Sequence, residues 1–124
     1  MIRAYICHPY TADPAGNVIK VRKLVEQFSH NAISRMISVD YKTYTKDYKN
    51  DPYIDVCVPI SPMLAFPEFM SEAGGVKREH AMAFCIALLA GCDELWVCSR
   101  TISDGMSEEI SWASVNSRKV VWKV

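Results

Sequence analysis

The side chain best placed for chemistry in this sequence is Glu109, a carboxylate in the early turns of a helix predicted over residues 105–117. Met106 and Ala113 lie three residues before it and four residues after it, so its carboxylate borders the apolar side of that helix. A strand-like apolar stretch precedes the helix, and such a position faces the crevice in which open parallel sheets bind ligands. Glu109 is therefore predicted to be functional. The alternative is an ordinary surface glutamate stabilised by the helix dipole.

The turn before this helix contains Ser103, Asp104 and Gly105. Ser103 and Asp104 are both candidates for the N-cap, and Gly105 leaves space for close approach of a ligand to the backbone. A hydroxyl and free N–H groups at a helix N-terminus can bind phosphate, and Arg100 in the preceding loop could pair with the same anion. Simple N-capping by Ser103 and a solvated Arg100 are the alternatives. Asp104 is expected to face away from the pocket, because it would repel an anion.

These residues belong to an alternating pattern of strands, near 2–7, 54–60, 94–98 and 119–123, and helices, near 17–31, 76–90 and 105–117. Alternation of this kind predicts a parallel sheet with helices on both faces. We therefore expect an α/β fold, a Rossmann-like three-layer sandwich with four to five parallel strands in the order 2-1-3-4. That order places the switch point between the first and third strands, which end near His8 and Arg100.

Several local features of these elements are also predicted. Asn17 can serve as the N-cap of the first helix. Residues 81–90 are apolar throughout, which is typical of a helix buried on much of its circumference, and Gly91 ends that helix. Residues 39–52 are polar and rich in tyrosine, and they are interpreted as an excursion from the fold, as a long loop, a small hairpin or a helical turn.

The composition predicts one soluble domain over residues 1–124. Fourteen basic and fourteen acidic residues give a net charge of zero, so there is no basic excess for binding nucleic acid. The longest apolar run is too short to span a membrane, and no signal peptide is recognised. The five cysteines form no Cys-x-x-Cys pair, which favours free thiols and a cytoplasmic location. No metal and no cofactor are expected, because the histidines lack ligand spacing and no glycine-rich nucleotide motif occurs.

Five segments of the chain together form a combination of motifs that can be compared with known families. They are Tyr5–Tyr10 (YICHPY), Asn17, Pro59–Pro62 (PISP), Cys92–Val97 (CDELWV), and Ser103–Ile110 (SDGMSEEI) followed by Ala113. This combination resembles the nucleoside 2-deoxyribosyltransferase-like superfamily, and most closely its small, often phage- or prophage-encoded branch of uncharacterised proteins. The resemblance covers nearly the whole chain except residues 39–52.

The resemblance implies roles for individual residues. Glu109 would attack the anomeric carbon of a 2′-deoxyribonucleoside, and Tyr5 would hold that carboxylate. Ser103, six residues before the glutamate, would bind the phosphate of a deoxynucleoside 5′-monophosphate. The further residues expected to contact substrate, from the motifs and from the strand ends, are His8, Pro9, Asn17, Arg100, Gly105 and Met106.

The chain departs from the family pattern at two positions. The region around Cys85 is apolar, where the resemblance implies an acid that protonates the leaving base, and Met63 stands where relatives often carry histidine. Two functions are therefore expected as alternatives. The first is hydrolysis or transfer at the N-glycosidic bond of a 2′-deoxyribonucleoside 5′-monophosphate. The second is a non-catalytic module that binds a nucleotide or a nucleotide-derived signal.

The expected partners are a small nucleotide or nucleoside and further copies of the same chain. The resemblance implies that a neighbouring subunit completes the crevice, so we expect a homodimer or a larger even oligomer. The apolar side chains of Leu64, Phe66, Phe69 and Met70, together with residues 39–52, offer a surface for it.

Overall fold

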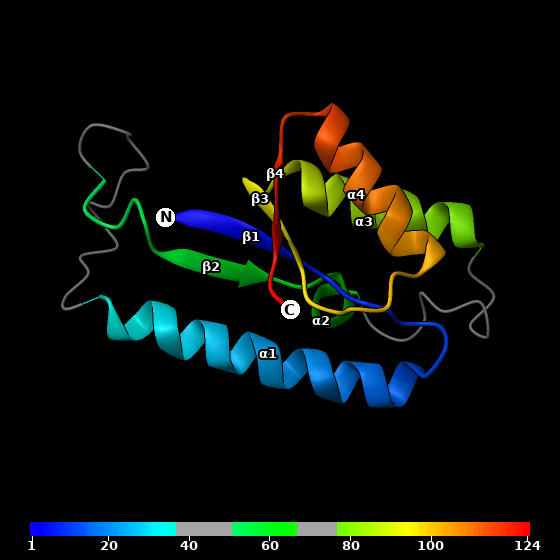
Figure 1. Ribbon diagram of the computed structural model, residues 1–124, viewed down its shortest axis with the longest axis horizontal. Coiled ribbons are helices and arrows are strands. Elements are labelled where there is room, and N and C mark those ends of the chain that lie inside the picture. The colour runs from blue at the N-terminus through cyan, green and yellow to red at the C-terminus, as the bar shows by residue number, and fades with distance from the viewer. Residues whose placement is uncertain (37–50, 67–76) are drawn as a thin grey trace.

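The four strands of the protein form one parallel sheet in the order β2-β1-β3-β4 (Figure 1). The computed structural model describes residues 1–36, 51–66 and 77–124. The elements run in the order β1 (Ile2–Cys7), α1 (Pro14–Ser34), β2 (Cys57–Ile60), α2 (Pro62–Ala65), α3 (Arg78–Ala90), β3 (Glu94–Val97), α4 (Asp104–Val115) and β4 (Lys119–Trp122). The predicted α/β fold and strand order 2-1-3-4 are therefore confirmed.

Helices cover the sheet on both faces, with α1 on one side and α3 and α4 on the other (Figure 1). Successive side chains of β1 point to opposite faces, as a strand requires. Tyr5 and Cys7 pack in the core beneath α3 and α4, whereas Ala4 and Ile6 pack against Val21 of α1. Burial on both faces explains why β1 reads as a continuous apolar run.

Helix α1 begins earlier than predicted, because its N-cap is Asp13 and not Asn17. The Asp13 carboxylate accepts a hydrogen bond of 3.2 Å from the Gly16 N–H, and Pro14 occupies the first helical turn, where its missing N–H costs nothing. Asn17 lies one turn inside the helix, where its N–H donates to the Asp13 carbonyl at 2.8 Å. The aspartate followed by proline thus sets the start of the helix.

Helix α4 begins as the turn chemistry predicted. Ser103 is its N-cap, and its hydroxyl oxygen accepts a hydrogen bond of 3.3 Å from the Met106 N–H. Met106 and Ala113 are buried in the core, so one side of the helix is held against the sheet. The packing of this side of the helix determines which way Glu109 points.

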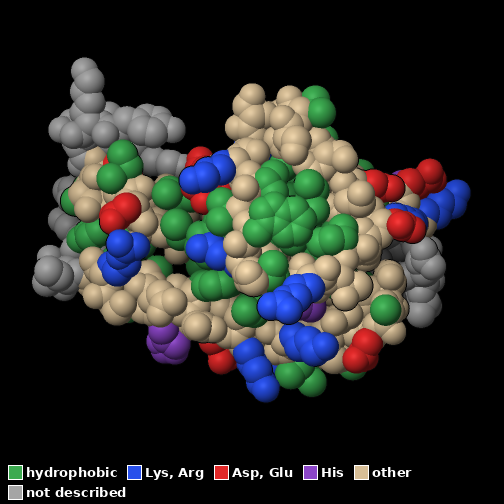
Figure 2. Space-filling view, viewed as in Figure 1, with side chains coloured by type: hydrophobic (Ala, Val, Ile, Leu, Met, Phe, Trp, Pro, Cys, Tyr) green, Lys and Arg blue, Asp and Glu red, His purple; other side chains and the backbone are tan. Residues whose placement is uncertain are grey.

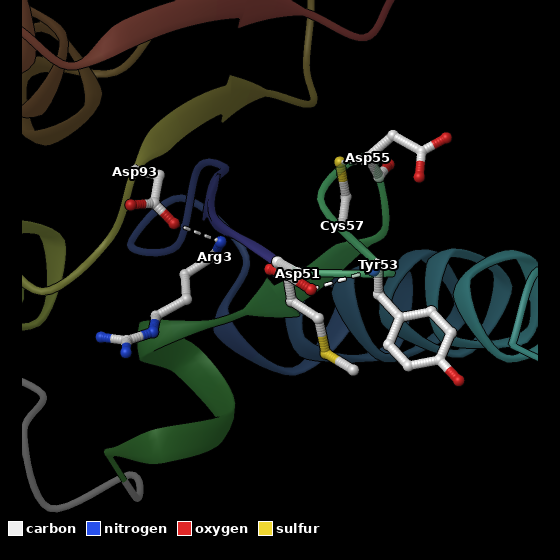
Figure 3. Close-up of polar contacts among 7 residues, drawn as sticks. Arg3, Asp51, Tyr53, Asp55, Cys57 and Asp93 are labelled. Carbon is white, nitrogen blue, oxygen red and sulfur yellow. Dashed lines mark hydrogen bonds and ion pairs between the residues drawn. The ribbon is translucent and has the colours of Figure 1, made fainter. Parts of the chain in front are cut away.

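The amino ends of the strands are tied together at one edge of the sheet (Figure 3). The Arg3 N–H donates to the Asp93 carboxylate at 2.8 Å, and the Tyr53 N–H donates to the Asp51 carboxylate at 2.9 Å. The Asp51 carboxylate also pairs with the terminal ammonium group of Met1. Residues 53–55 form a turn, so β2 starts at Cys57 and not near residue 54 as predicted. The opposite edge, where the strands end, is left for the ligand site.

Helix α3 is less buried than its composition predicted. Leu89 is its one fully buried residue, whereas Ala83, Phe84 and Ala87 are exposed, with 51% of the Phe84 surface accessible. One side of α3 packs on the sheet and α4; on the opposite side the ring of Phe84 meets that of Phe66 edge to face at 5.6 Å, and Ala83, Phe84 and Ala87 are otherwise exposed among the described residues. Burial on most of the helix circumference is therefore not found within the described part of the chain.

Two predicted features fall outside the described residues. They are most of the excursion over 39–52, and the apolar residues Phe69 and Met70. A short helix, α2, follows β2 directly and is capped by Ser61.

The surface carries charges of both signs. Figure 2 shows hydrophobic side chains gathered near the centre of the face in view, with basic and acidic side chains around them. A uniform basic surface of the kind that binds a phosphate backbone is not seen on this face. None of the helices in the described part of the chain combines the length and hydrophobicity needed to cross a lipid bilayer.

Candidate functional site

A cavity of about 540 Å³ opens at the carboxyl ends of β1, β2 and β3, where open parallel sheets bind their ligands. Its volume lies in the range of small-molecule sites. Its walls come from the loop after β1, from α2, from the first half of α3 and from the start of α4. The lining residues are His8, Tyr10, Thr11, Pro62, Met63, Phe66, Arg78, Ala81, Met82, Cys85, Ile102, Ser103, Asp104, Gly105, Met106 and Glu109.

Glu109 reaches the cavity from the second turn of α4. The residue is only 7% exposed, and its Oε2 atom has no hydrogen-bond partner among the described residues. Its neighbour Glu108 points to solvent, with 57% of its side chain exposed. A buried and incompletely paired carboxylate is costly for folding, so its position beside a cavity calls for a functional explanation.

Tyr5 lies beneath the cavity floor and does not itself line the cavity. It comes from β1, is fully buried, and its hydroxyl also lacks a hydrogen-bond partner within the described ranges. Burial raises the pKa of Tyr5, and the neighbouring charge of Glu109 and the Cys85 thiol raise it further. The sheet, α3 and α4 thus bring three titratable side chains to one point.

The protonation states of these groups follow from their surroundings. Burial raises the pKa of Glu109 to about 7, while the Tyr5 hydroxyl acts to lower it and Glu108 to raise it. Burial, followed by the charge of Glu109, raises the pKa of the Cys85 thiol to about 11. Near neutral pH, Glu109 is therefore divided between its acid and carboxylate forms, and Cys85 is a neutral thiol.

The N-terminus of α4 forms one side of the cavity mouth. Ser103, Gly105 and Met106 all line it, as expected from the sequence. A Cβ atom added at Gly105 would meet the Met82 sulfur at 3.7 Å, an ordinary contact, so packing within the chain does not demand glycine there. Asp104 also borders the cavity, contrary to the expectation that it faces away.

The loop after β1 contributes one predicted residue directly. His8 lines the cavity, and its Nδ1–H donates to the Pro9 carbonyl at 2.9 Å, which leaves Nε2 for a ligand. Pro9 and Asn17 do not line the cavity. The buried Asn17 donates from its side-chain amide to the Tyr10 carbonyl at 3.2 Å, and Tyr10 in turn lines the cavity. Asn17 thus supports the loop from behind.

The cationic residue at the cavity is Arg78 and not Arg100. Arg100 is exposed in the loop after β3 and lies outside the cavity lining. Arg78 lines the cavity from the first turn of α3, and its Nη2 lies 3.5 Å from Glu108 Oε1. The sequence carried a signal for this placement, because Arg78, Met82 and Cys85 are spaced by four and three residues and so share one face of the helix.

Comparison with known proteins identifies the family. A family model described as a domain of unknown function (DUF7768) matches residues 38–123, which is more than half of the chain. The chain belongs to the DUF7768 family. No curated protein and no solved structure shows significant similarity to it.

The DUF7768 match contains much of the cavity. Arg78, Cys85, Ser103 and Glu109 lie inside the matched residues, whereas β1 with Tyr5 lies outside them. Within the described ranges, no group of three or more His, Cys, Asp or Glu side chains is arranged to hold a metal ion.

Proposed function

We propose that the cavity binds a 2′-deoxyribonucleoside 5′-monophosphate and that Glu109 cleaves its N-glycosidic bond as a nucleophile. The observation that carries this proposal is the buried carboxylate of Glu109, which faces a cavity of nucleotide size with one oxygen unpaired. Carboxylates placed in this way form covalent glycosyl intermediates in retaining glycosidases.

The reaction proceeds in two balanced steps. A Glu109 carboxylate oxygen forms a bond to the anomeric carbon, and the bond from that carbon to the base nitrogen breaks, with its electron pair leaving on the base. The base takes up a proton from water that enters through the cavity mouth, which leaves a hydroxide. Water then attacks the anomeric carbon of the glycosyl ester, the bond to the Glu109 oxygen breaks to regenerate the carboxylate, and the proton released by the attacking water neutralises the hydroxide; attack by a second base instead makes the reaction a transfer.

The surroundings of Glu109 suit this role. Tyr5 lies beneath it, and the hydroxyl of Tyr5 favours the charged form of the carboxylate. Ser103 and Gly105 stand at the cavity mouth, where the hydroxyl and the start of α4 can bind a phosphate group. This set of residues matches the roles implied by the resemblance to the nucleoside 2-deoxyribosyltransferase-like superfamily.

A second function is favoured by the chemistry beside Glu109. Cys85, a thiol that stays protonated at neutral pH, occupies the wall where the resemblance implies an acid. Asp104 and Glu109 are the only carboxylates among the lining residues that the structure describes. Without an acid for the leaving base, the same cavity would serve as a non-catalytic nucleotide-binding module.

One experiment separates the two functions. The protein is incubated with the four deoxynucleoside 5′-monophosphates and the four deoxynucleosides, and free base is measured by chromatography while binding is measured by calorimetry. Release of base from a monophosphate supports the glycosidase. Binding of a monophosphate without release supports the binding module, and the absence of both contradicts the proposal.

Other features support a proposal for the assembly and location of the protein. Cys7, Cys57, Cys85 and Cys98 are free thiols, which suits a reducing compartment such as the cytoplasm. The side of α3 that carries Phe84 is apolar and exposed among the described residues, which suits contact with a second copy of the chain, so a homodimer is included in the proposal.

A further inference from the structure

Arg78 is the one side chain with a permanent positive charge among the described residues that line the cavity. It lies in the first turn of α3 and shares the cavity with the N-terminus of α4, where Ser103 and Gly105 stand. The guanidinium group presents a planar set of donors that matches the oxygens of a phosphate monoester. The cavity therefore combines a cation and a helix N-terminus with the unpaired, buried Glu109.

The ion pair of Arg78 with Glu108 is weak by its geometry. A single contact of 3.5 Å joins Nη2 to Oε1, and the two side chains are 49% and 57% exposed. Water screens such a pair, so a ligand can displace it easily. The pair holds the guanidinium near the cavity mouth but leaves it able to bind another anion.

The charge of the cavity makes Arg78 decisive for an anionic ligand. The other charged side chains of the lining are Asp104 and Glu109, and both are acidic. Without Arg78 the two carboxylates would carry a formal charge of −2, which repels a phosphate from the mouth. Arg78 reduces this formal charge to −1, so it weakens the repulsion and offers the anion an attractive partner beside the N–H groups of α4.

We infer that Arg78 recognises the phosphate monoester of the ligand and exchanges Glu108 for that phosphate when the ligand binds. This inference rests on the proposed function for the identity of the ligand, and it adds the residue that selects a 5′-monophosphate over a free nucleoside. Glu108 holds the guanidinium in the empty cavity, so it competes with the phosphate.

The test measures the binding of two small probes to the full chain by calorimetry. The probes are 2-deoxyribose 5-phosphate and 2-deoxyribose, which differ in the phosphate group alone. Arg78→Gln should weaken binding of the phosphorylated probe by about ten- to a hundredfold and leave the other probe unchanged, because a charged hydrogen-bond partner is lost. Arg78→Lys should recover part of that affinity, since the charge remains but the fork of donors does not.

Two further variants complete the design. Arg100→Gln removes the same charge from an exposed residue outside the cavity, and should leave both affinities unchanged. Glu108→Gln should strengthen binding of the phosphorylated probe by a few-fold, because the competing carboxylate is gone. Melting temperatures of the variants establish that each is folded.

The outcomes separate this inference from the proposed reaction. Equal losses in Arg78→Gln and Arg100→Gln would overturn the assignment, since the effect would then be general electrostatics. Failure of the wild type to prefer the phosphorylated probe, or weaker binding after Glu108→Gln, would overturn it as well. If the Arg78 dependence is found but no base is released from any nucleotide, the proposed cleavage fails and the assignment stands. If base is released equally from nucleosides and monophosphates in wild type and Arg78→Gln, the cleavage stands and the assignment falls.

Discussion

The carboxyl group of Glu109, in α4, lies beside the hydroxyl of Tyr5, in β1. The hydroxyl is close enough to lower the pKa of the carboxyl group, yet the two do not form a hydrogen bond of regular geometry. Both side chains are buried, so each polar group pays a desolvation cost that the other incompletely offsets. Such a pair has capacity for a further partner, and the adjacent cavity is where that partner can bind.

The first prediction concerns the carboxylate as nucleophile. Glu109→Gln should lower the rate of base release by a factor on the order of a thousand or more, because the amide cannot form the glycosyl ester. Binding of the monophosphate should survive. Single-turnover assays and calorimetry measure the two effects separately. The matched control is Glu26→Gln, which changes an exposed residue of α1 on the other face of the sheet. Full turnover in Glu109→Gln would exclude the nucleophile.

The second prediction concerns Tyr5. Since the carboxylate form reacts, the rate of base release should rise with pH through the pKa of Glu109, at about 7 in the free protein. Tyr5→Phe removes a group that lowers this pKa, so the rising limb should move to higher pH. Tyr53→Phe, at the opposite edge of the sheet, should leave the profile in place. An unshifted profile in Tyr5→Phe would contradict an electrostatic role for the hydroxyl.

The third prediction concerns stability and pH. Burial raises the pKa of Glu109 from 4.5 to about 7, so between these values the unfolded chain releases this proton more readily than the folded chain. The wild type should therefore lose stability through this residue as the pH rises from about 4.5 to 7. Glu109→Gln has no titrating group at this position, so its stability does not fall in this way. The free energy of unfolding of Glu109→Gln minus that of the wild type should therefore grow between these pH values, by on the order of 3 kcal/mol.

Urea unfolding of the two proteins at intervals between pH 4 and pH 9 measures this difference. The comparison isolates Glu109, because the other titrating groups are common to both proteins. A difference that does not change with pH would show that Glu109 titrates normally in the folded protein.

The fourth prediction concerns assembly. Phe84 is 51% exposed on the outer side of α3, between the exposed Ala83 and Ala87. From Ala81 onward the helix is apolar all round, and a helix of this kind is normally buried, so this side suits contact with a second copy. The protein should sediment as a dimer or larger even oligomer at micromolar concentration, and Phe84→Glu should give monomers. Ile33→Glu, which adds the same charge to an exposed position of α1, should not. A wild-type monomer would contradict the prediction.

Features set by the local pattern of residues could be predicted from the sequence. The alternation of apolar runs and helical periods predicts the strand order, because right-handed crossovers allow few arrangements of four parallel strands. The spacing of Met106, Glu109 and Ala113 also places the carboxylate at the border of the core, because residues three and four apart lie on the same side of a helix. The N-cap of α4 is also a local feature: the sequence offered Ser103 and Asp104, and the structure selects Ser103.

The tertiary structure alone decided which charges meet at the cavity. Arg78 and Asp104 border it and Arg100 does not, because these positions depend on how α3, α4 and the loop after β3 pack together. The start of α1 at Asp13, one turn before the predicted Asn17, was likewise not predicted from the sequence. The exposure of Phe84 is also a tertiary property: periodicity shows that a helix is apolar, but which of its sides is covered depends on the elements packed against it.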